Sequence, residues 1–196
     1  TPAALRFAAM KASATGDLTA VTSPQNVTVT FAGTSGAWTA VASQPWVQIT
    51  NGAGTGAGLF TVGIINPANV IGASSSLTAT ITVTSSVPGL LSAMVPVALT
   101  VYFPATTGPF GAFDTPVNGA TNLRGSFAVT GWALDDIGVD RVELWRDKVA
   151  GETTPTYVGP GHPGDGKIFI ANAIFVSGSR PDVEAAYPNT PFAQRA

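Results

Sequence analysis

The stretch Gly131–Asp147 reads GWALDDIGVDRVELWRD and holds two of the chain's four tryptophans. Leading into it, Phe127–Leu134 is a run of aromatic and β-favouring residues, which predicts a strand. Asp135–Gly138 has the residue types of a turn, and Val139–Trp145 alternates in the way that a strand with two different faces does. We therefore predict a β-hairpin here, with the paired aspartates in its turn.

The same period-two alternation recurs upstream of this stretch. Asn26–Phe31 reads NVTVTF and Leu77–Thr84 reads LTATITVT, so that apolar and threonine residues take turns. Short apolar runs follow one another between turns rich in Gly, Pro and Ser, and no segment shows the period of a helix. Strands of this length and spacing are typical of sandwiches and barrels, so the sequence predicts an all-β fold.

A short segment near the middle of the chain has the composition of a linker. Pro104–Pro109 reads PATTGP, and two prolines with a glycine give a stiff connection. The chain has 196 residues, which suits two β-modules of about 100 residues each. We predict two tandem immunoglobulin-like β-sandwiches, residues 1–103 and 109–196, joined by a linker at 104–108.

Charge is sparse and unevenly placed. Charged residues make up 10% of the chain, against about 25% in an average protein. Arg6, Lys11 and Asp17 are the charged residues before Phe103, and the others follow from Asp114 onward. Surfaces wetted mainly by Ser, Thr and Asn are usual in secreted bacterial repeat proteins and fibre subunits, so we expect a secreted or cell-surface location.

Composition also excludes several function classes. The net charge of −2 argues against nucleic acid as a partner, because phosphate binding needs a basic surface. No apolar run is long enough to cross a membrane as a helix, so no membrane insertion is expected. The chain has no cysteine, which excludes a disulfide framework, a thiolate metal site and a thiol nucleophile.

The first predicted module resembles a known family. Ala37-Trp38, the run QPWVQI at Gln44–Ile49, the glycine-rich loop at Asn51–Gly58, and Phe60-Thr61-Val62 together look like a BACON-type immunoglobulin-like domain over residues 4–103. The resemblance implies a sandwich of seven to eight strands, found in secreted bacterial multidomain proteins. The family name records a proposed association with carbohydrate, so polysaccharide is a candidate partner.

The second predicted module resembles an immunoglobulin-like module that recurs in large secreted proteins of soil bacteria. The matching motifs are FDTPVNG from Phe113, GWALDD from Gly131, VELWRD from Val142, and RPDV from Arg180. Such modules usually carry further strands after this point, so the resemblance implies a second sandwich that is incomplete at its C-terminus. An incomplete sandwich has an open edge that accepts an added strand, and strand exchange between subunits would build a fibre.

Asp135, Asp136 and Asp140, with Asp114 in the same module, are candidate calcium ligands. Calcium takes six to eight oxygen ligands, which acidic loops in extracellular sandwiches often supply. The spacing does not match an EF-hand loop. The favoured interpretation is that Asp135 and Asp136 stabilise a turn through side-chain-to-backbone hydrogen bonds. No cofactor other than calcium is considered.

The tryptophans are candidate sugar-stacking residues, because an aromatic face packs on the apolar face of a pyranose. Trp46 follows Pro45 at a strand start, and Trp145 shares a strand parity with charged residues, so these two are the candidate glycan platform. Trp38 and Trp132 lie between apolar neighbours and are expected in the core. For each of the four, core packing is the favoured interpretation.

Nothing in the sequence predicts catalysis. His162 is the single histidine and lies in the loop-type sequence GPGHPGDG, without a nucleophile or metal motif. Glu143 and Glu152 form a carboxylate pair only by elimination. We predict a non-catalytic structural or adhesive component that associates with itself or with other surface proteins, or alternatively a carbohydrate-binding accessory module.

Overall fold

The computed structural model describes residues 4–13, 15–67, 74–103, 106–153, 167–176 and 178–192. These residues form thirteen strands and one short helix, so the predicted all-β class is confirmed. The chain divides into two compact units. Unit 1 comprises Thr1–Phe110, Leu134–Gly138 and Tyr187–Ala193, and unit 2 comprises Gly111–Ala133, Val139–Ala186 and Gln194–Ala196.

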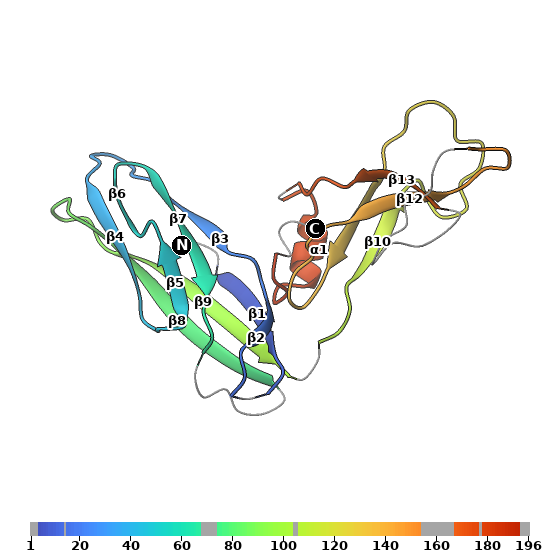
Figure 1. The fold of residues 1–196 in the computed structure, drawn as a ribbon. Helices are drawn as coiled ribbons and strands as arrows, with labels where there is room; N and C mark the ends of the chain where they lie inside the picture. The colour runs from blue at the N-terminus through green and yellow to red at the C-terminus, as the bar shows by residue number, and fades with distance from the viewer. Residues whose placement is uncertain are drawn as a thin grey trace. The chain divides into compact units, whose positions relative to one another are not determined.

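Six strands of unit 1 form one sheet (Figure 1). Their order is β2 (Leu18–Val21), β1 (Leu5–Lys11), β9 (Ala93–Tyr102), β8 (Ser74–Ser85), β4 (Ala37–Ala42) and β6 (Ala53–Thr55). β1 and β9 are parallel, and the other pairs are antiparallel. In β9 the buried residues alternate with more exposed ones, as the period-two pattern predicts: Val95, Val97, Leu99 and Val101.

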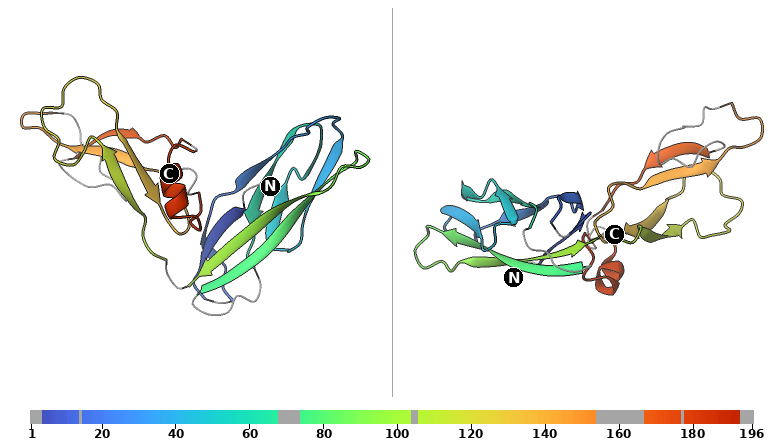
Figure 2. Two further views of the ribbon diagram at one scale, coloured as in Figure 1. Left: turned by 180° about the vertical axis from the view of Figure 1, so that it is seen from behind. Right: turned by 60° about the horizontal axis from the view of Figure 1, so that its bottom comes forward.

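Three further strands form the second sheet of unit 1, in the order β3 (Gln25–Val29), β7 (Gly58–Ile64) and β5 (Val47–Thr50), all antiparallel. The two sheets share one hydrophobic core, to which β1, β4, β5, β7, β8 and β9 all contribute. Phe60 of β7 is fully buried, and its ring centroid lies 5.9 Å from that of Trp38 in β4. Figure 2 shows the unit from behind, with β8 and β9 in front.

The glycine-rich segment Asn51–Gly58, predicted as a loop, contains a short strand. It contains β6, which pairs with β4, and it encloses the indole of Trp38. The Trp38 ring nitrogen donates a hydrogen bond to the carbonyl of Gly56 at 3.0 Å. A Cβ atom at Gly54 or at Gly58 would lie 2.8 Å from the Trp38 ring, so both glycines leave room for the indole.

Polar side chains buried in unit 1 bond to backbone carbonyls. The Gln25 amide donates to the carbonyl of Arg6 at 2.6 Å, and the Thr22 hydroxyl donates to the carbonyl of Ala8 at 3.1 Å. Lys11 is only 2% exposed, and its ammonium group donates to the carbonyl of Pro67 at 3.3 Å. These bonds offset the cost of removing the polar atoms from water.

Two further sheets of two strands each are formed by β10 (Phe110–Thr115) with β11 (Thr130–Leu134), and by β12 (Glu143–Asp147) with β13 (Lys167–Asn172). The predicted hairpin over Gly131–Asp147 is therefore wrong, because β11 and β12 belong to different sheets. Residues 135–142 connect them. The Asp135–Gly138 turn is present, but the chain does not return to pair with the strand that it has just left.

Helix α1 (Pro181–Ala186) was not predicted from the sequence. Its start does carry recognisable signals, because proline suits the first helical position and acidic residues favour the first turn. Pro181 occupies that position, and Asp182 and Glu184 follow it. Val183 is the buried residue of the helix, at 4% exposure.

Unit 2 buries much less apolar surface than unit 1. Among its described residues, Ile168 and Val183 are the buried hydrophobic side chains, whereas the core cluster of unit 1 contains thirteen. Every residue of β10 is exposed. The large hydrophobic side chains that unit 2 leaves exposed are Phe113, Val117, Leu123, Phe127, Val129, Val149, Phe169, Ile170, Ile174, Phe175 and Val176.

Candidate functional site

Asp135 serves the turn that follows β11. Its Oδ2 atom accepts hydrogen bonds from the backbone N–H groups of Ile137, at 2.9 Å, and Gly138, at 3.1 Å. Gly138 has a φ of 136°, a conformation that favours glycine. This geometry agrees with the favoured interpretation, in which the carboxylate stabilises a turn through its own backbone.

Asp136 bonds to a different segment. Its Oδ2 accepts hydrogen bonds from the backbone N–H of Thr107 at 3.1 Å and from the Thr107 hydroxyl at 3.0 Å. Its Oδ1 is buried and has no hydrogen-bond partner in the part of the chain that the structure describes. Burial of the Tyr102 phenol, and then the negative charges of Asp136 and Asp135, raise the pKa of Tyr102.

Asp140 is apart from this arrangement. Its side chain is 92% exposed, and one carboxylate oxygen lies 3.6 Å from the Arg141 guanidinium. The described ranges contain no group of three or more His, Cys, Asp or Glu side chains that could hold a metal ion. Asp135 and Asp136 accept hydrogen bonds and Asp140 lies in an ion pair, and calcium binding by these three residues stays a prediction.

The structure agrees with the favoured interpretation that Trp46 packs in the core, and it does not support Trp46 as a sugar-stacking residue. Trp46 is 7% exposed and belongs to the core cluster of unit 1, so its ring offers no face to a sugar. The sequence signal was a proline before the tryptophan, which marks a strand start but says nothing about which way the side chain points. Trp38 is 3% exposed, in agreement with its predicted core position.

Trp145 is half-buried and pairs with an aromatic residue across the β12–β13 ladder. Its ring meets that of Phe169 edge to face, with centroids 5.3 Å apart. Its ring nitrogen donates to Oε2 of Glu143 at 3.1 Å. Trp132 is also half-buried, which is less than its predicted core position requires. The Trp145–Phe169 pair is thus an aromatic surface in unit 2, although the two rings are not coplanar.

Two of the four motifs that define the second resemblance meet at Arg180. Its guanidinium donates to both carboxylate oxygens of Asp182, at 2.9 and 2.7 Å, and to Oδ2 of Asp114 in β10. The FDTPVNG and RPDV motifs are therefore joined by an ion pair that ties the start of α1 to β10. The sequence analysis had placed Asp114 among the calcium candidates and had not paired it with Arg180.

The ion pairs of Arg180 with Asp114 and Asp182 have a structural effect, because they hold the start of α1 against β10. The hydrogen bond from Arg180 is the main cause that lowers the pKa of Asp182 to about 2. The bond to Asp182, with the nearby charge of Asp114, raises the pKa of Arg180. An arginine whose fork is engaged by two carboxylates has little capacity left for a ligand. We therefore read this cluster as structural.

Glu143 and Glu152, the carboxylates that were catalytic candidates only by elimination, both form ion pairs. Glu143 accepts from the Arg141 Nε at 2.6 Å, and Glu152 accepts from the Arg146 guanidinium at 2.8 Å. His162 lies outside the described residues.

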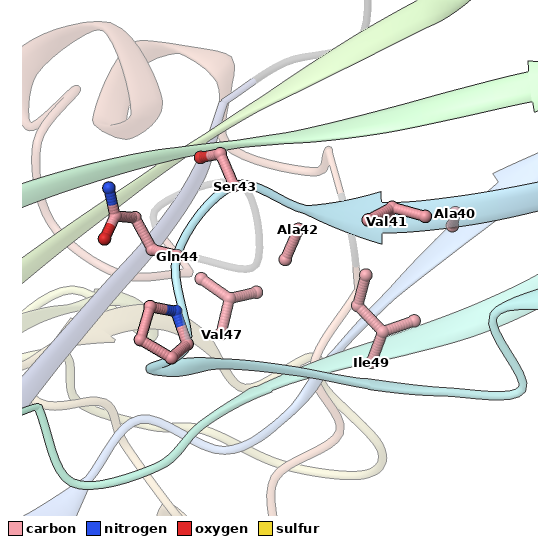
Figure 3. A pocket seen from close by; sticks show the side chains of 8 residues that line it. Ala40, Val41, Ala42, Ser43, Gln44, Val47 and Ile49 are labelled. Atoms are coloured by element: carbon pink, nitrogen blue, oxygen red, sulfur yellow. The ribbon is translucent and has the colours of Figure 1, made fainter.

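A shallow depression of about 500 Å³ lies between the end of β4 and β5 in unit 1. Figure 3 shows Ala42, Val47 and Ile49 pointing into it, with Ser43 and Gln44 at one end. None of its lining residues carries a titratable side chain. The depression therefore offers an apolar floor and an amide group, but no group for acid–base chemistry.

In the described part of the chain, no helix is both long and apolar enough to span a membrane. No family model and no curated protein matches the chain. Among solved structures, the chain is similar to a Bacteroides ovatus GH5 xyloglucanase in complex with a XXXG heptasaccharide, with a TM-score of 0.38 and 19% sequence identity. The match covers 59% of this chain and 21% of that chain, so the chain spans about a fifth of that protein's length.

Proposed function

We propose that the chain is a non-catalytic structural or adhesive part of a secreted or cell-surface assembly. In this proposal both units are immunoglobulin-like sandwiches in tandem, and the first is of the BACON type. The second sandwich is completed by strands that join its open edges. The partners are other copies of the chain or other surface proteins.

The observation that carries the proposal is the contrast between the two units. Unit 1 encloses a core between two sheets, whereas the described residues of unit 2 form two separate pairs of strands and leave most of their large apolar side chains exposed. Sheets of two strands are marginally stable in water, and large apolar patches mark interaction surfaces. Added strands would supply both the missing hydrogen bonds and the missing cover.

The ionisable groups support a role without catalysis. Arg146, Asp147, Glu152 and Lys167 are engaged with one another around the β12–β13 sheet, in pairs that join Arg146 to Glu152 and Lys167 to Asp147. Asp114, Arg180 and Asp182 fix α1. A catalytic centre needs acid and base groups that converge on a substrate pocket, and the depression in unit 1 is lined without them.

A carbohydrate-binding accessory module is the second candidate. One observation favours it, because Phe169 is 42% exposed next to the half-buried ring of Trp145, and Asn172 lies opposite Glu143 in the same ladder. Aromatic rings with a neighbouring amide are the groups that bind sugars. The edge-to-face arrangement of the two rings gives this candidate a smaller stacking surface than a pair of coplanar rings would.

Electron microscopy of the purified full-length chain tests the proposal. Filaments or regular multi-subunit particles are expected if copies complete one another. Dispersed single particles, together with a positive glycan array that is lost on Phe169→Ala, would overturn the proposal in favour of the second candidate. In Phe169→Ala the thermal melting profile serves as the control for folding.

A further inference from the structure

Strand β13 after its first residue, Lys167, and the four residues that follow the strand form an uncharged apolar segment. Residues 168–176 read IFIANAIFV and contain no charge, proline or glycine. Ile170 is 55% exposed, Ile174 87% and Val176 58%, and both phenylalanines are more than a third exposed. We call Ile168–Val176 the apolar edge.

The two edges of this sheet differ in chemistry. On β12, Glu143, Arg146 and Asp147 are charged, and they are engaged with Arg141, Glu152 and Lys167. Charged side chains keep an edge strand from pairing with another chain. The apolar edge carries no charged side chain, and in the described part of the chain β12 is the strand that pairs with β13. An exposed uncharged edge of this kind is a template for strand addition.

The ladder between β12 and β13 continues one residue beyond the end of β13 at Asn172. The N–H of Ala173 donates to the carbonyl of Val142 at 2.8 Å, which extends the ladder that places Leu144 opposite Ala171. In an antiparallel ladder, alternate residues bond to alternate sides. Because Ala171 and Ala173 face β12, the N–H and C=O groups of Asn172 point away from it, toward the open side.

The sequence of the apolar edge is a palindrome about Asn172. Alanine lies on both sides of it, then isoleucine at 170 and 174, phenylalanine at 169 and 175, and a branched aliphatic residue at 168 and 176. If two copies pair antiparallel about a two-fold axis at Asn172, Ile170 meets Ile174 and Phe169 meets Phe175 of the second copy. Apolar and aromatic cross-strand pairs stabilise a sheet, and no like charges meet.

We propose that the apolar edge pairs with the apolar edge of a second copy of this chain, antiparallel and centred on Asn172. The result is a four-stranded sheet in the order β12–β13–β13–β12, with the charged β12 edges outermost. The register shift between Leu144 and Trp145 changes the ladder locally at Ile170 and leaves the centre at Asn172 unchanged.

This inference deepens the proposed function and rests on it, because strand addition to unit 2 is common to both. A two-fold contact uses the same surface on both copies and closes as a dimer. A fibre would therefore require a second, different contact. The sequence analysis predicts strand exchange that builds a fibre, so the palindrome specifies a different first step of assembly.

Single-cysteine variants test the register of the proposed strand pairing, because the chain has no native cysteine that could form a competing disulfide. Directly opposed residues of an antiparallel pair are close enough for a disulfide. We expect Asn172→Cys to form a disulfide-linked dimer on the order of tenfold faster than Val149→Cys, an exposed position on the same unit. In an equimolar mixture of Ile170→Cys and Ile174→Cys, the mixed dimer should exceed both symmetric dimers.

Adding Ile174→Lys to the Asn172→Cys variant should remove its faster disulfide formation relative to Val149→Cys. Each copy would then bring one lysine into the paired strands. Ile174 is 87% exposed, so the fold should tolerate lysine, and a thermal melt of the variant checks this. Equal rates for Asn172→Cys and Val149→Cys, a rate advantage that survives Ile174→Lys, or an excess of symmetric dimers would each overturn the inference. Filaments that form without preferential linkage at Asn172 would retain the proposed function and overturn this inference alone.

Discussion

At the scale of single residues, Trp38 and the glycines around it explain how the glycine-rich segment of unit 1 is held. A Cβ atom at Gly54 would lie 2.8 Å from Cζ2 of Trp38 and 3.0 Å from Cε2, so alanine must displace the ring. We expect Gly54→Ala to lower the free energy of unfolding by about 1–3 kcal/mol. Chemical denaturation measures the change.

Gly33→Ala is the matched control for this substitution. A Cβ atom at Gly33 has nothing within 4 Å, so alanine there should change the free energy of unfolding by less than about 0.5 kcal/mol. Equal effects of the two substitutions would contradict the account of the Trp38 enclosure.

Lys11 provides a second prediction at this scale. Its side chain is 98% removed from solvent, and its ammonium group donates to the Pro67 carbonyl. A buried cation contributes little net stability, whereas its aliphatic stem fills space. Lys11→Met should change the free energy of unfolding by less than about 1 kcal/mol, and Lys11→Ala should lower it by about 2–4 kcal/mol. A larger loss in Lys11→Met than in Lys11→Ala would contradict this reading.

Single residues also show what the sequence could and could not predict. The turn at Asp135 followed from local chemistry, because the aspartate bonds to its own backbone. Core packing is the favoured interpretation of Trp46 from the sequence, and the structure agrees. The burial of Lys11 did not follow from the sequence, since burial depends on which strands pack over a residue, and Lys11 reaches a carbonyl 56 residues away.

At the scale of elements, α1 depends on the ion pairs of Arg180. The hydrogen bond from Arg180 lowers the pKa of Asp182 to about 2, below its ordinary value of 3.8. A carboxyl whose pKa is lowered by folding contributes stability above its unfolded pKa and loses it as the pH falls. The contribution of Asp182 should therefore be present above about pH 4 and disappear toward pH 2.

Titration of the Asp182 carboxyl by NMR checks this expectation. The inflection should lie near pH 2 in the wild type and move up toward the ordinary aspartate value in Arg180→Gln. An inflection that does not move on removal of the guanidinium would show that another group causes the lowered pKa. The thermal melt of Arg180→Gln at neutral pH controls for loss of the fold.

At the scale of elements, a sequence pattern can predict a strand but not the strand that it pairs with. The alternation in Val139–Trp145 predicted a strand that the structure confirms only at its end, where β12 begins at Glu143. The pairing was wrong, because a period of two gives the faces of a strand but not the identity of its neighbour. The partner of β12 is β13, which follows some twenty residues later in the chain. The helix was missed because six residues are too few to show a period, although Pro181 and its acids were visible.

At the scale of the whole molecule, the two units should differ in local stability. Unit 1 has a core that both of its sheets enclose, and unit 2 buries few large apolar side chains among its described residues. Amides of β8 and β9 should exchange with solvent at least about tenfold more slowly than those of β10 and β11. Hydrogen exchange read by mass spectrometry measures this, and equal protection in both units would contradict the contrast.

The all-β class could be predicted for the whole chain because alternation and turn residues recur along it. The alternation alone does not distinguish the two units, since both have strand-like sequences. What separates them is how many strands face each other across a core, and that is set by pairing over long distances. The BACON-type resemblance and the immunoglobulin-like architecture of both units remain proposals.

The central claim is that unit 2 is completed by another copy of the chain. Sedimentation equilibrium of the full-length protein over a concentration series tests it most directly. The account predicts a mass that rises from one chain to two as concentration increases, and a mass that stays at one chain in Ile174→Lys. A wild-type protein that remains a single chain at every soluble concentration would contradict the account.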